Sequence, residues 1–148
     1  VRTFVLQSSM SMASAILVSG TAGYRYAFND ALIHLHPPRI ELNVQNQKDQ
    51  TRILEFQDLF IERFYGLFAD NTKLPEYAVQ IKGGAVSDQA TSADICKRKE
   101  RIKKFIDGER FLTTEQALQA GMIDHIVCPG NRLLDEIFKF SSKKGDLP

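Results

Sequence analysis

The sequence predicts an α/β fold, in which helices and strands form stacked layers. Short runs rich in β-branched and aromatic residues alternate along the chain with amphipathic or apolar runs of helical length. Such alternation is typical of layered α/β proteins rather than of all-helical bundles or sandwiches of sheets. The chain contains no internal repeat, so we expect one layered unit.

Composition narrows the function classes. The chain has 148 residues, 43% hydrophobic and 25% charged, which suffices for a core in one globular domain. A formal net charge of +1 favours neither a nucleic-acid binder nor a polyanion receptor. Cys96 and Cys128 lie far apart and outside any metal-binding spacing, so we expect a reducing compartment and no disulfide framework. No membrane-spanning run or signal peptide is visible, and the strand-like start at Val1 suggests a chain that begins within a domain.

The first elements are a strand and a short helix. Val1–Leu6 is β-rich and mostly apolar, as a buried strand would be, and Gln7–Met10 reads as a polar break. Met12–Ser19 is apolar nearly all round, which predicts a buried helix. Ser11 or a neighbouring serine is its expected N-cap, and Gly20 suits the position just after its end.

Two further strands lead to a pair of histidines. Tyr24–Phe28 reads as a short strand, followed by an Asn-Asp turn. Ala31–His36 alternates between two faces. One face carries Ala31, Ile33 and Leu35, and the other carries Leu32, His34 and His36. Pro37 and Pro38 then end ladder pairing, and Arg39–Val44 is a candidate for another strand.

The longest predicted element is a helix from about Asp49 to Ala69. Its apolar residues recur at helical spacing over a broad face: Ile53, Leu54, Phe56, Phe60, Ile61, Phe64, Tyr65, Leu67 and Phe68. One small sheet offers too little surface to cover so wide a stripe. The helix is therefore either a core helix or one that uses part of its face as a subunit contact.

The second half alternates again. A helix starts near Pro75, a loop without periodicity covers Gln80–Ala93, and Asp94–Ile106 is a basic helix. The basic cluster indicates a solvated helix face. A polyanion contact is the minor alternative, because no aromatic residues interleave with the charges. Glu109–Leu112 is short and extended.

A capping box marks the next helix. Thr113 as N-cap and Gln116 at N3 predict a helix over Thr114–Ala120 that ends at Gly121. Met122–Val127 reads as the last strand. An amphipathic helix around residues 133–138 is expected before the tail.

The chemistry depends on a serine and the histidines. The chain has no G-x-S-x-G elbow, Walker loop, G-x-G-x-x-G or H-E-x-x-H motif. A serine at a helix start and an imidazole at a strand end are parts of an acyl-transfer site, if they meet. Ser11 with His36 is the candidate pair, and His34 is a rival on the same face. Taken alone, a serine before a helix is most often only a helix cap, and Ser11 has that alternative.

Two separated blocks resemble the ClpP family of serine peptidases. The first, VRTFVLQSSMSMASAILVSGTAGYRYAFNDALIHLHPP, matches without a gap. Its matching landmarks are Ser11-Met12, Gly20, Gly23, Arg25, Ala27 and His36-Pro37-Pro38. The second block, ERFLTTEQALQAGMIDHIV, resembles the family's segment around its catalytic acid.

The resemblance implies roles for individual residues. Ser11 would be the nucleophile, His36 the base, and the backbone N–H of Met12 one oxyanion donor. Glu109 stands where the family has its catalytic aspartate, with Asp107 as a rival acid. The resemblance implies no metal and no cofactor.

Several departures bear on activity. Glu109 is one methylene longer than aspartate, Gln7 replaces a usual glycine, and Met10 replaces a usual small residue. Residues 80–101 read as an insertion close to the acid. The family's amino-terminal portion, with a glycine that supplies the other oxyanion N–H, has no counterpart in the sequence.

The resemblance also implies architecture and partners. We expect a ClpP/crotonase-like layered domain over residues 1–140, with a handle region at 39–69 and a flexible tail at 141–148. The implied partners are other ClpP- or ClpR-type subunits in stacked seven-membered rings, an AAA+ unfoldase and unfolded polypeptide, without nucleic acid or membrane. The expected compartment is the plastid stroma, with bacterial cytosol and mitochondrial matrix as alternatives.

Two other functions stay open at the level of sequence. The first is a non-catalytic ClpR-like ring subunit, which Glu109 and the insertion favour and which Ser11 and His36 oppose. The second is a crotonase-like acyl-CoA enzyme, which shares the layered fold. The His36-Pro37 strand end and the handle-like helix argue against it.

Overall fold

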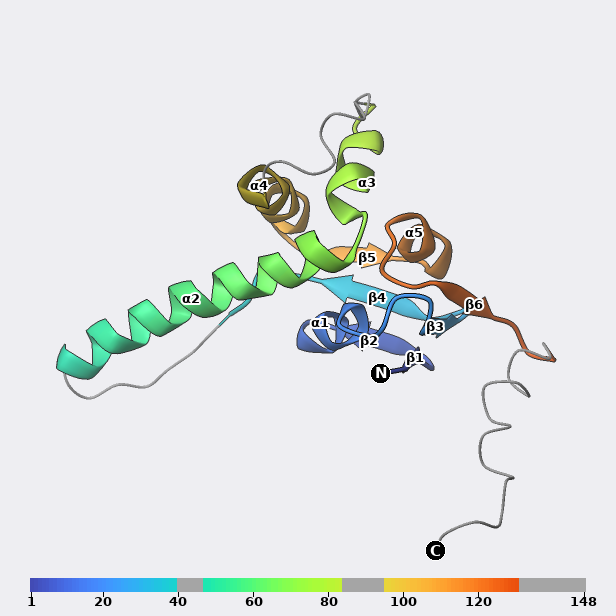
Figure 1. The fold of residues 1–148 in the computed structure, drawn as a ribbon, viewed down its shortest axis with the longest axis horizontal. Coiled ribbons are helices and arrows are strands. Elements are labelled where there is room, and N and C mark those ends of the chain that lie inside the picture. Colours follow the sequence, from blue (N-terminus) through green and yellow to red (C-terminus); the bar gives the residue numbers. More distant parts are fainter. Residues whose placement is uncertain (40–46, 84–94, 131–148) are drawn as a thin grey trace, which may run out of the picture.

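The computed structural model describes residues 1–39, 47–83 and 95–130 and has the predicted mixed α/β architecture (Figure 1). Its strands are β1 (Thr3–Val5), β2 (Ser8–Met10), β3 (Arg25–Phe28), β4 (Leu32–Leu35), β5 (Arg110–Leu112) and β6 (His125–Val127). Its helices are α1 (Met12–Val18), α2 (Gln47–Asn71), α3 (Leu74–Gln80), α4 (Ile95–Ile106) and α5 (Thr114–Gln119). Most of the strand predicted at 39–44 and of the loop predicted at 80–93, together with the last helix and the tail, lies outside the described residues.

The strands form two three-stranded sheets. One has the order β1-β3-β6 and the other β2-β4-β5. The β4–β5 pair is antiparallel, and the other three pairs are parallel. Parallel neighbours need a crossover connection, and α1 lies on the crossover from β2 to β4. The serine-bearing end of β2 and the histidine-bearing end of β4 therefore meet at one sheet edge.

The alternation predicted for the fourth strand is confirmed. Ala31, Ile33 and Leu35 are buried in the core. Leu32 is 48% exposed on the opposite face, the face that also carries His34. The face of this sheet that carries Leu32 and His34 is therefore its partly exposed face.

Three predictions for the amino-terminal region are wrong. The buried strand expected over Val1–Leu6 forms only at Thr3–Val5, where Val5 alone is buried. Ser8–Met10 forms β2 rather than a break, because the buried Ser9 finds polar partners in the packed structure: its carbonyl oxygen lies 3.0 Å from Ser14 Oγ. The helix α1 is not buried all round, since Met12 and Ile16 are 42% and 63% exposed. The sheets cover one side of α1 and leave the other side open.

The helix ends show which local signals hold. The capping box is confirmed, because Thr113 Oγ1 accepts from Gln116 N–H at 3.3 Å and Gln116 Oε1 accepts from Thr113 N–H at 3.0 Å. Gly121 ends α5 with a φ of 64°, as predicted. The strand predicted from Met122 pairs only over His125–Val127, since the turn at Gly121 delays its entry into the ladder.

Gly20 is needed for a different reason than predicted. Its φ is not positive, so it does not act as a left-handed helix cap. A Cβ at this position would lie 2.5 Å from Thr3 Oγ1 and 2.9 Å from Arg25 Cγ. The absence of a side chain therefore allows α1 to end against β1 and β3.

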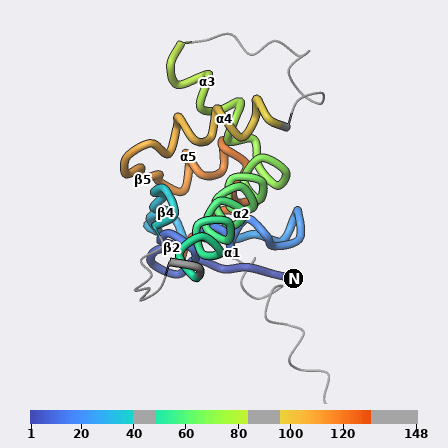
Figure 2. Tube along the Cα trace, turned by 90° about the vertical axis from the view of Figure 1, so that its left-hand side faces the viewer, coloured from blue at the N-terminus to red at the C-terminus, as the bar shows by residue number. Residues whose placement is uncertain are grey.

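The long helix α2 is buried along only part of its length. Its carboxyl-terminal half contributes Phe64, Tyr65 and Phe68 to the core. Its amino-terminal half projects beyond the strands (Figures 1 and 2), and there Phe56 and Leu59 are 57% and 51% exposed. No helix in the described part of the chain has the length and apolarity that a membrane crossing requires. The subunit-contact alternative for α2 thus concerns this projecting half.

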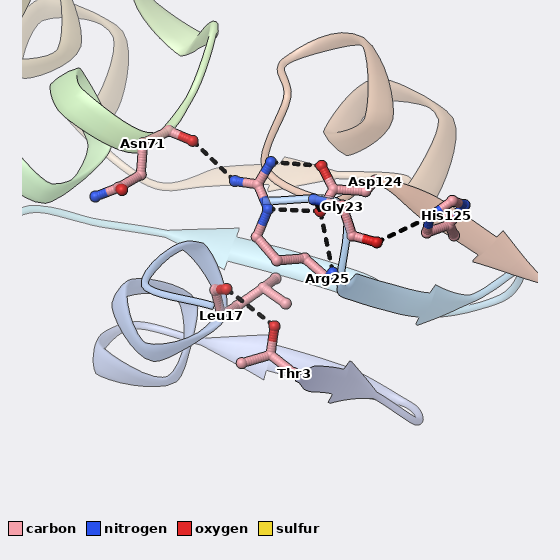
Figure 3. Close-up of polar contacts among 7 residues, drawn as sticks. All are labelled: Thr3, Leu17, Gly23, Arg25, Asn71, Asp124 and His125. Carbon is pink, nitrogen blue, oxygen red and sulfur yellow. Dashed lines mark hydrogen bonds and ion pairs between the residues drawn. The ribbon is translucent and has the colours of Figure 1, made fainter. Parts of the chain in front are cut away.

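A buried ion pair joins the two sequence blocks (Figure 3). Arg25, at the start of β3, donates from Nη2 to Asp124 Oδ1 at 2.6 Å and from Nε to Oδ2 at 2.9 Å. The backbone N–H of Gly23 also donates to Oδ2, and Arg25 Nη1 donates to the Asn71 carbonyl at the end of α2. Hydrogen bonding from Arg25 lowers the pKa of Asp124 despite partial burial. One guanidinium therefore connects β3, the entry to β6 and the end of α2.

Candidate active site

Ser11 lies in a strained turn between a strand and a helix. It follows β2 and is the N-cap of α1, with φ 54° and ψ −119°. Among the described residues it is the one non-glycine residue with a positive φ. Its hydroxyl makes no capping hydrogen bond, so the hydroxyl is not committed to stabilising the helix. A reactive serine held on a sharp strand-to-helix turn is the arrangement that a nucleophile elbow provides.

Hydrogen bonds attach this turn to the histidine strand. The backbone N–H of Ser11 donates to the His34 carbonyl at 3.0 Å, and Ser14 N–H donates to the Ser11 carbonyl at 3.0 Å. The fully buried Ser14 Oγ lies 3.1 Å from the same His34 carbonyl. In the ladder, Met10 pairs with His34. The serine turn and the histidine strand are thus rigidly adjacent, as the candidate pair requires.

The two histidines differ in their surroundings. His36 Nδ1 lies 2.7 Å from the Pro37 carbonyl oxygen. Because a carbonyl only accepts, Nδ1 carries the hydrogen and Nε2 of the neutral ring carries the lone pair. The His34 ring instead stacks on Phe111 with centroids 4.3 Å apart, and its Nε2 is buried without a hydrogen-bond partner among the described residues. Of the two rings, His36 is the one whose tautomer suits a general base.

The carboxylate of Glu109 lies beside His34. Its Oε2 is 4.0 Å from His34 Nε2, which is an electrostatic contact rather than a hydrogen bond, and its side chain is 56% exposed. Glu109 forms no ion pair with His36 in the described part of the chain. The rival acid Asp107 is exposed. Its charge lies close enough to Tyr65 to raise the pKa of that phenol, which burial raises more strongly. The role of Glu109 toward His36 remains a prediction.

Other parts of the predicted site are close but not joined. Ser11 Oγ makes no hydrogen bond to His34 or His36 within the described residues. Such bonds are often long until substrate binds. Met12 is the first residue of α1, so its backbone N–H has no partner within the helix and is suited to donate to an oxyanion.

A cavity lined by neighbours of Ser11 in sequence does not include these residues. It has a volume of about 250 Å³ and lies between β1, β2 and α1. Its lining consists of Thr3, Phe4, Val5, Ser8, Ser9, Ala13, Ile16 and Leu17. Ser11 and His36 instead directly follow β2 and β4, and Glu109 directly precedes β5, so all three adjoin one end of the β2-β4-β5 sheet. Within the described residues, no three His, Cys, Asp or Glu side chains are grouped to hold a metal ion.

Sequence reasoning missed two features of this region. It treated Arg25 only as a landmark and did not single out Asp124, although the two form the ion pair that joins the two blocks. The available signal was a charged residue at the edge of each apolar strand run. It also did not single out Ser14, whose hydroxyl lies 3.0 Å from the Ser9 carbonyl of β2 and 3.1 Å from the His34 carbonyl of β4.

Comparisons with known proteins find relatives of one kind. No protein-family model matches the chain. The chain is 29% identical over 127 residues to ATP-dependent Clp protease proteolytic subunit 1 of Mycolicibacterium paratuberculosis, covering 86% of this chain and 50% of that protein. It is 28% identical over 142 residues to the ATP-dependent Clp protease proteolytic subunit of Mesostigma viride, covering 96% of this chain and 51% of that protein. The chain spans about half the length of both, and over most of its own length it is similar to the proteolytic subunits of ATP-dependent Clp proteases.

Proposed function

We propose that the chain is a catalytic subunit of a Clp-type serine protease with a ClpP/crotonase-like layered fold. The observation that carries the proposal is Ser11, whose hydroxyl makes no capping hydrogen bond. Ser11 lies in a strained strand-to-helix turn, and its backbone N–H is bonded to the strand that bears His34 and leads to His36. The similarity to Clp proteolytic subunits supports the same reaction class. Strain at a non-glycine residue persists where packing over-determines it, most often at functional sites.

The proposed reaction is acyl transfer from a peptide bond. Ser11 Oγ attacks the carbonyl carbon while His36 Nε2 accepts the hydroxyl proton, and Met12 N–H donates to the developing oxyanion. His36 then gives the proton to the leaving amine as the C–N bond breaks. Water hydrolyses the resulting ester in the reverse sense and frees Ser11. Glu109 is proposed to orient the His36 ring and to stabilise it once it is protonated.

The proposed setting is a ring of several subunits. The substrate is unfolded polypeptide delivered by an ATP-dependent AAA+ unfoldase, and other ClpP- or ClpR-type subunits complete stacked seven-membered rings. The projecting half of α2, with exposed Phe56 and Leu59, is the proposed contact between rings. The proposed compartment is the plastid stroma, with bacterial cytosol and mitochondrial matrix as alternatives.

A second candidate is a non-catalytic, ClpR-like ring subunit. It is favoured by the 4.0 Å contact of Glu109 with His34 and by the absence of a described hydrogen bond from Ser11 Oγ to either imidazole. Loss of the acid function by amidation lowers turnover by about 10⁴-fold in a Ser-His-Asp triad, so an acid that does not reach His36 would be costly. The two candidates differ in whether Ser11 is reactive.

Labelling of the assembled particle with a fluorophosphonate separates these candidates. We expect label on Ser11, its loss in Ser11→Ala, and a loss of at least about 10³-fold in labelling rate in His36→Ala. His34→Phe is the matched variant, because it retains the stack on Phe111 while removing both ring nitrogens. It should keep most of the labelling. A particle whose other subunits are labelled while Ser11 is not would establish the scaffold role instead.

A further inference from the structure

A groove with an apolar floor and a cationic rim lies between α3 and α4, which pack side by side (Figures 1 and 2). Its volume is about 240 Å³. Its lining consists of Ala78, Val79, Lys82, Arg101, Lys104 and Phe105. Ala78 and Phe105 are buried and form the floor, whereas the lysines are exposed at the rim. The groove shares no residue with the candidate active site.

The basic residues of α4 divide into two groups. On the side toward α2, Lys99 and Lys103 pair with Glu62 at 3.3 Å and 2.8 Å. Hydrogen bonding to Lys103 lowers the pKa of Glu62, and the same contact raises the pKa of Lys103. Arg98 pairs with Glu76 of α3. These cations have their counter-charges within the protein.

The cations of the groove have no such partners. Lys82, Arg101 and Lys104 form no ion pair with a carboxylate anywhere in the described part of the chain. Three positive charges thus surround one apolar depression, although the formal net charge of the whole chain is only +1. Charge complementarity therefore favours an anionic partner with an apolar group between its charges.

We propose that the α3–α4 groove binds an acidic peptide segment that carries aliphatic anchor side chains. One anchor lies on the floor formed by Ala78, Val79 and Phe105, and flanking carboxylates pair with Arg101, Lys104 and Lys82. This is recognition of an amphipathic segment by a groove, with anchors spaced by a helical turn. The inference does not depend on peptidase activity.

The lining favours a peptide over a nucleic acid. Single-stranded nucleic acids are bound by cationic grooves in which exposed aromatic rings stack on the bases. The single aromatic residue of this lining, Phe105, is 3% exposed and packs edge-on against Tyr77, so its face is not available for stacking. An apolar floor is instead suited to an aliphatic side chain.

Fluorescence anisotropy on the full chain tests the proposal. The probe is a short fluorescein-labelled peptide in which Asp and Glu flank two leucines one helical turn apart. We expect saturable binding that weakens as salt is raised. Arg101→Glu combined with Lys104→Glu should weaken it by about tenfold or more. The matched control, Arg52→Glu with Arg63→Glu on exposed positions of α2, makes the same charge change and should retain binding.

Four results would overturn the proposal. The first two are no binding by a chain that has the circular dichroism of the folded protein, and an equal loss of binding in both double variants. The other two are equal affinity for a peptide with serines in place of the leucines, and tighter binding of a single-stranded oligonucleotide that displaces the peptide. Replacement of residues 84–94 by a Gly-Ser linker provides a fifth arm. Binding that appears only in that variant would identify the chain's own segment as the occupant. Loss of Ser11 labelling would leave all these outcomes unchanged.

Discussion

Ser11 has a backbone conformation that L-amino acids rarely adopt. The cost of such a conformation is on the order of 1–3 kcal/mol, which the hydrogen bonds from Ser11 N–H and Ser14 to the His34 carbonyl must offset. The hydroxyl itself makes no hydrogen bond to the helix. At this position, stability and reactivity therefore depend on different atoms of one residue.

Replacement of Ser11 by glycine should separate these two properties. Ser11→Gly relieves the positive φ and should raise the free energy of unfolding by about 1 kcal/mol while abolishing fluorophosphonate labelling. Ser11→Ala is the control, because it removes the hydroxyl but retains the strain, and its stability should stay near that of the parent. Urea unfolding measures the difference. A glycine variant less stable than the alanine variant would contradict the strain argument.

At the scale of elements, Arg98 attaches α4 to two neighbouring helices. Its guanidinium donates to the Ala69 carbonyl in the last turn of α2 at 2.7 Å and to the Thr72 carbonyl just after the helix at 3.1 Å, and it pairs with Glu76 of α3. The last carbonyls of a helix have no partners within it, and Arg98 satisfies that of Ala69. The other oxygen of Glu76, Oε2, is buried without a described hydrogen bond.

Removal of this guanidinium should destabilise the helical layer. Arg98→Met leaves the Glu76 carboxylate largely buried and uncompensated, and we expect a loss of about 3 kcal/mol in the free energy of unfolding. Lys104→Met is the matched control, since Lys104 is exposed and forms no described ion pair, and it should change stability by less than about 0.5 kcal/mol. Thermal and urea unfolding compare the variants. Equal effects of the two substitutions would refute the role assigned to Arg98.

The projecting half of α2 provides a second prediction for an element. Phe56 and Leu59 lie three residues apart, on one side of the helix, and both are more than half exposed. If this side joins subunits, Phe56→Glu combined with Leu59→Glu should lower the mass of the assembled particle in sedimentation velocity without unfolding the chain. Arg63→Glu, an exposed change on the same helix, should not. An unchanged particle mass in the double variant would remove α2 from the proposed contact.

For the whole molecule, the Arg25–Asp124 pair connects both sequence blocks and the end of α2. The Asp124 carboxylate accepts hydrogen bonds from both Arg25 and Gly23, so its negative form is favoured in the folded state. Its folded pKa is therefore lower than its unfolded pKa. The stability that it contributes is present above the unfolded pKa and is lost as pH falls through the folded pKa.

The pH dependence of unfolding tests this link. Between neutral pH and about pH 2, the free energy of unfolding should fall, and the fall should be shallower in Asp124→Asn, which has no carboxylate to protonate. At neutral pH that variant should be less stable by about 3 kcal/mol, because Arg25 is buried without its counter-charge. The variant and the parent are compared by urea unfolding at a series of pH values. Parallel pH profiles would show that Asp124 makes no such contribution.

The sequence by itself determined the features that depend on near neighbours. The capping box of Thr113 and Gln116, the start of α3 at Pro75 and the alternation of Ala31, Ile33 and Leu35 were all predictable. Each depends on hydrogen bonds or on periodicity within a few residues, and the spacing of residue types along the chain predicts both. The assignment of Ser11 and His36 as a candidate pair came instead from the resemblance of two sequence blocks to the ClpP family.

Only the tertiary structure decided the contacts between distant segments. It paired Ser8–Met10 with β4, left one side of α1 exposed, joined Arg25 to Asp124 and brought Glu109 to His34 rather than to His36. None of these contacts can be predicted from composition or from hydrophobic periodicity. The packing of distant surfaces determines which strands pair and which charges meet. The identity of a candidate serine is thus a local property, whereas its backbone strain and the ring that its acid meets are properties of the packed molecule.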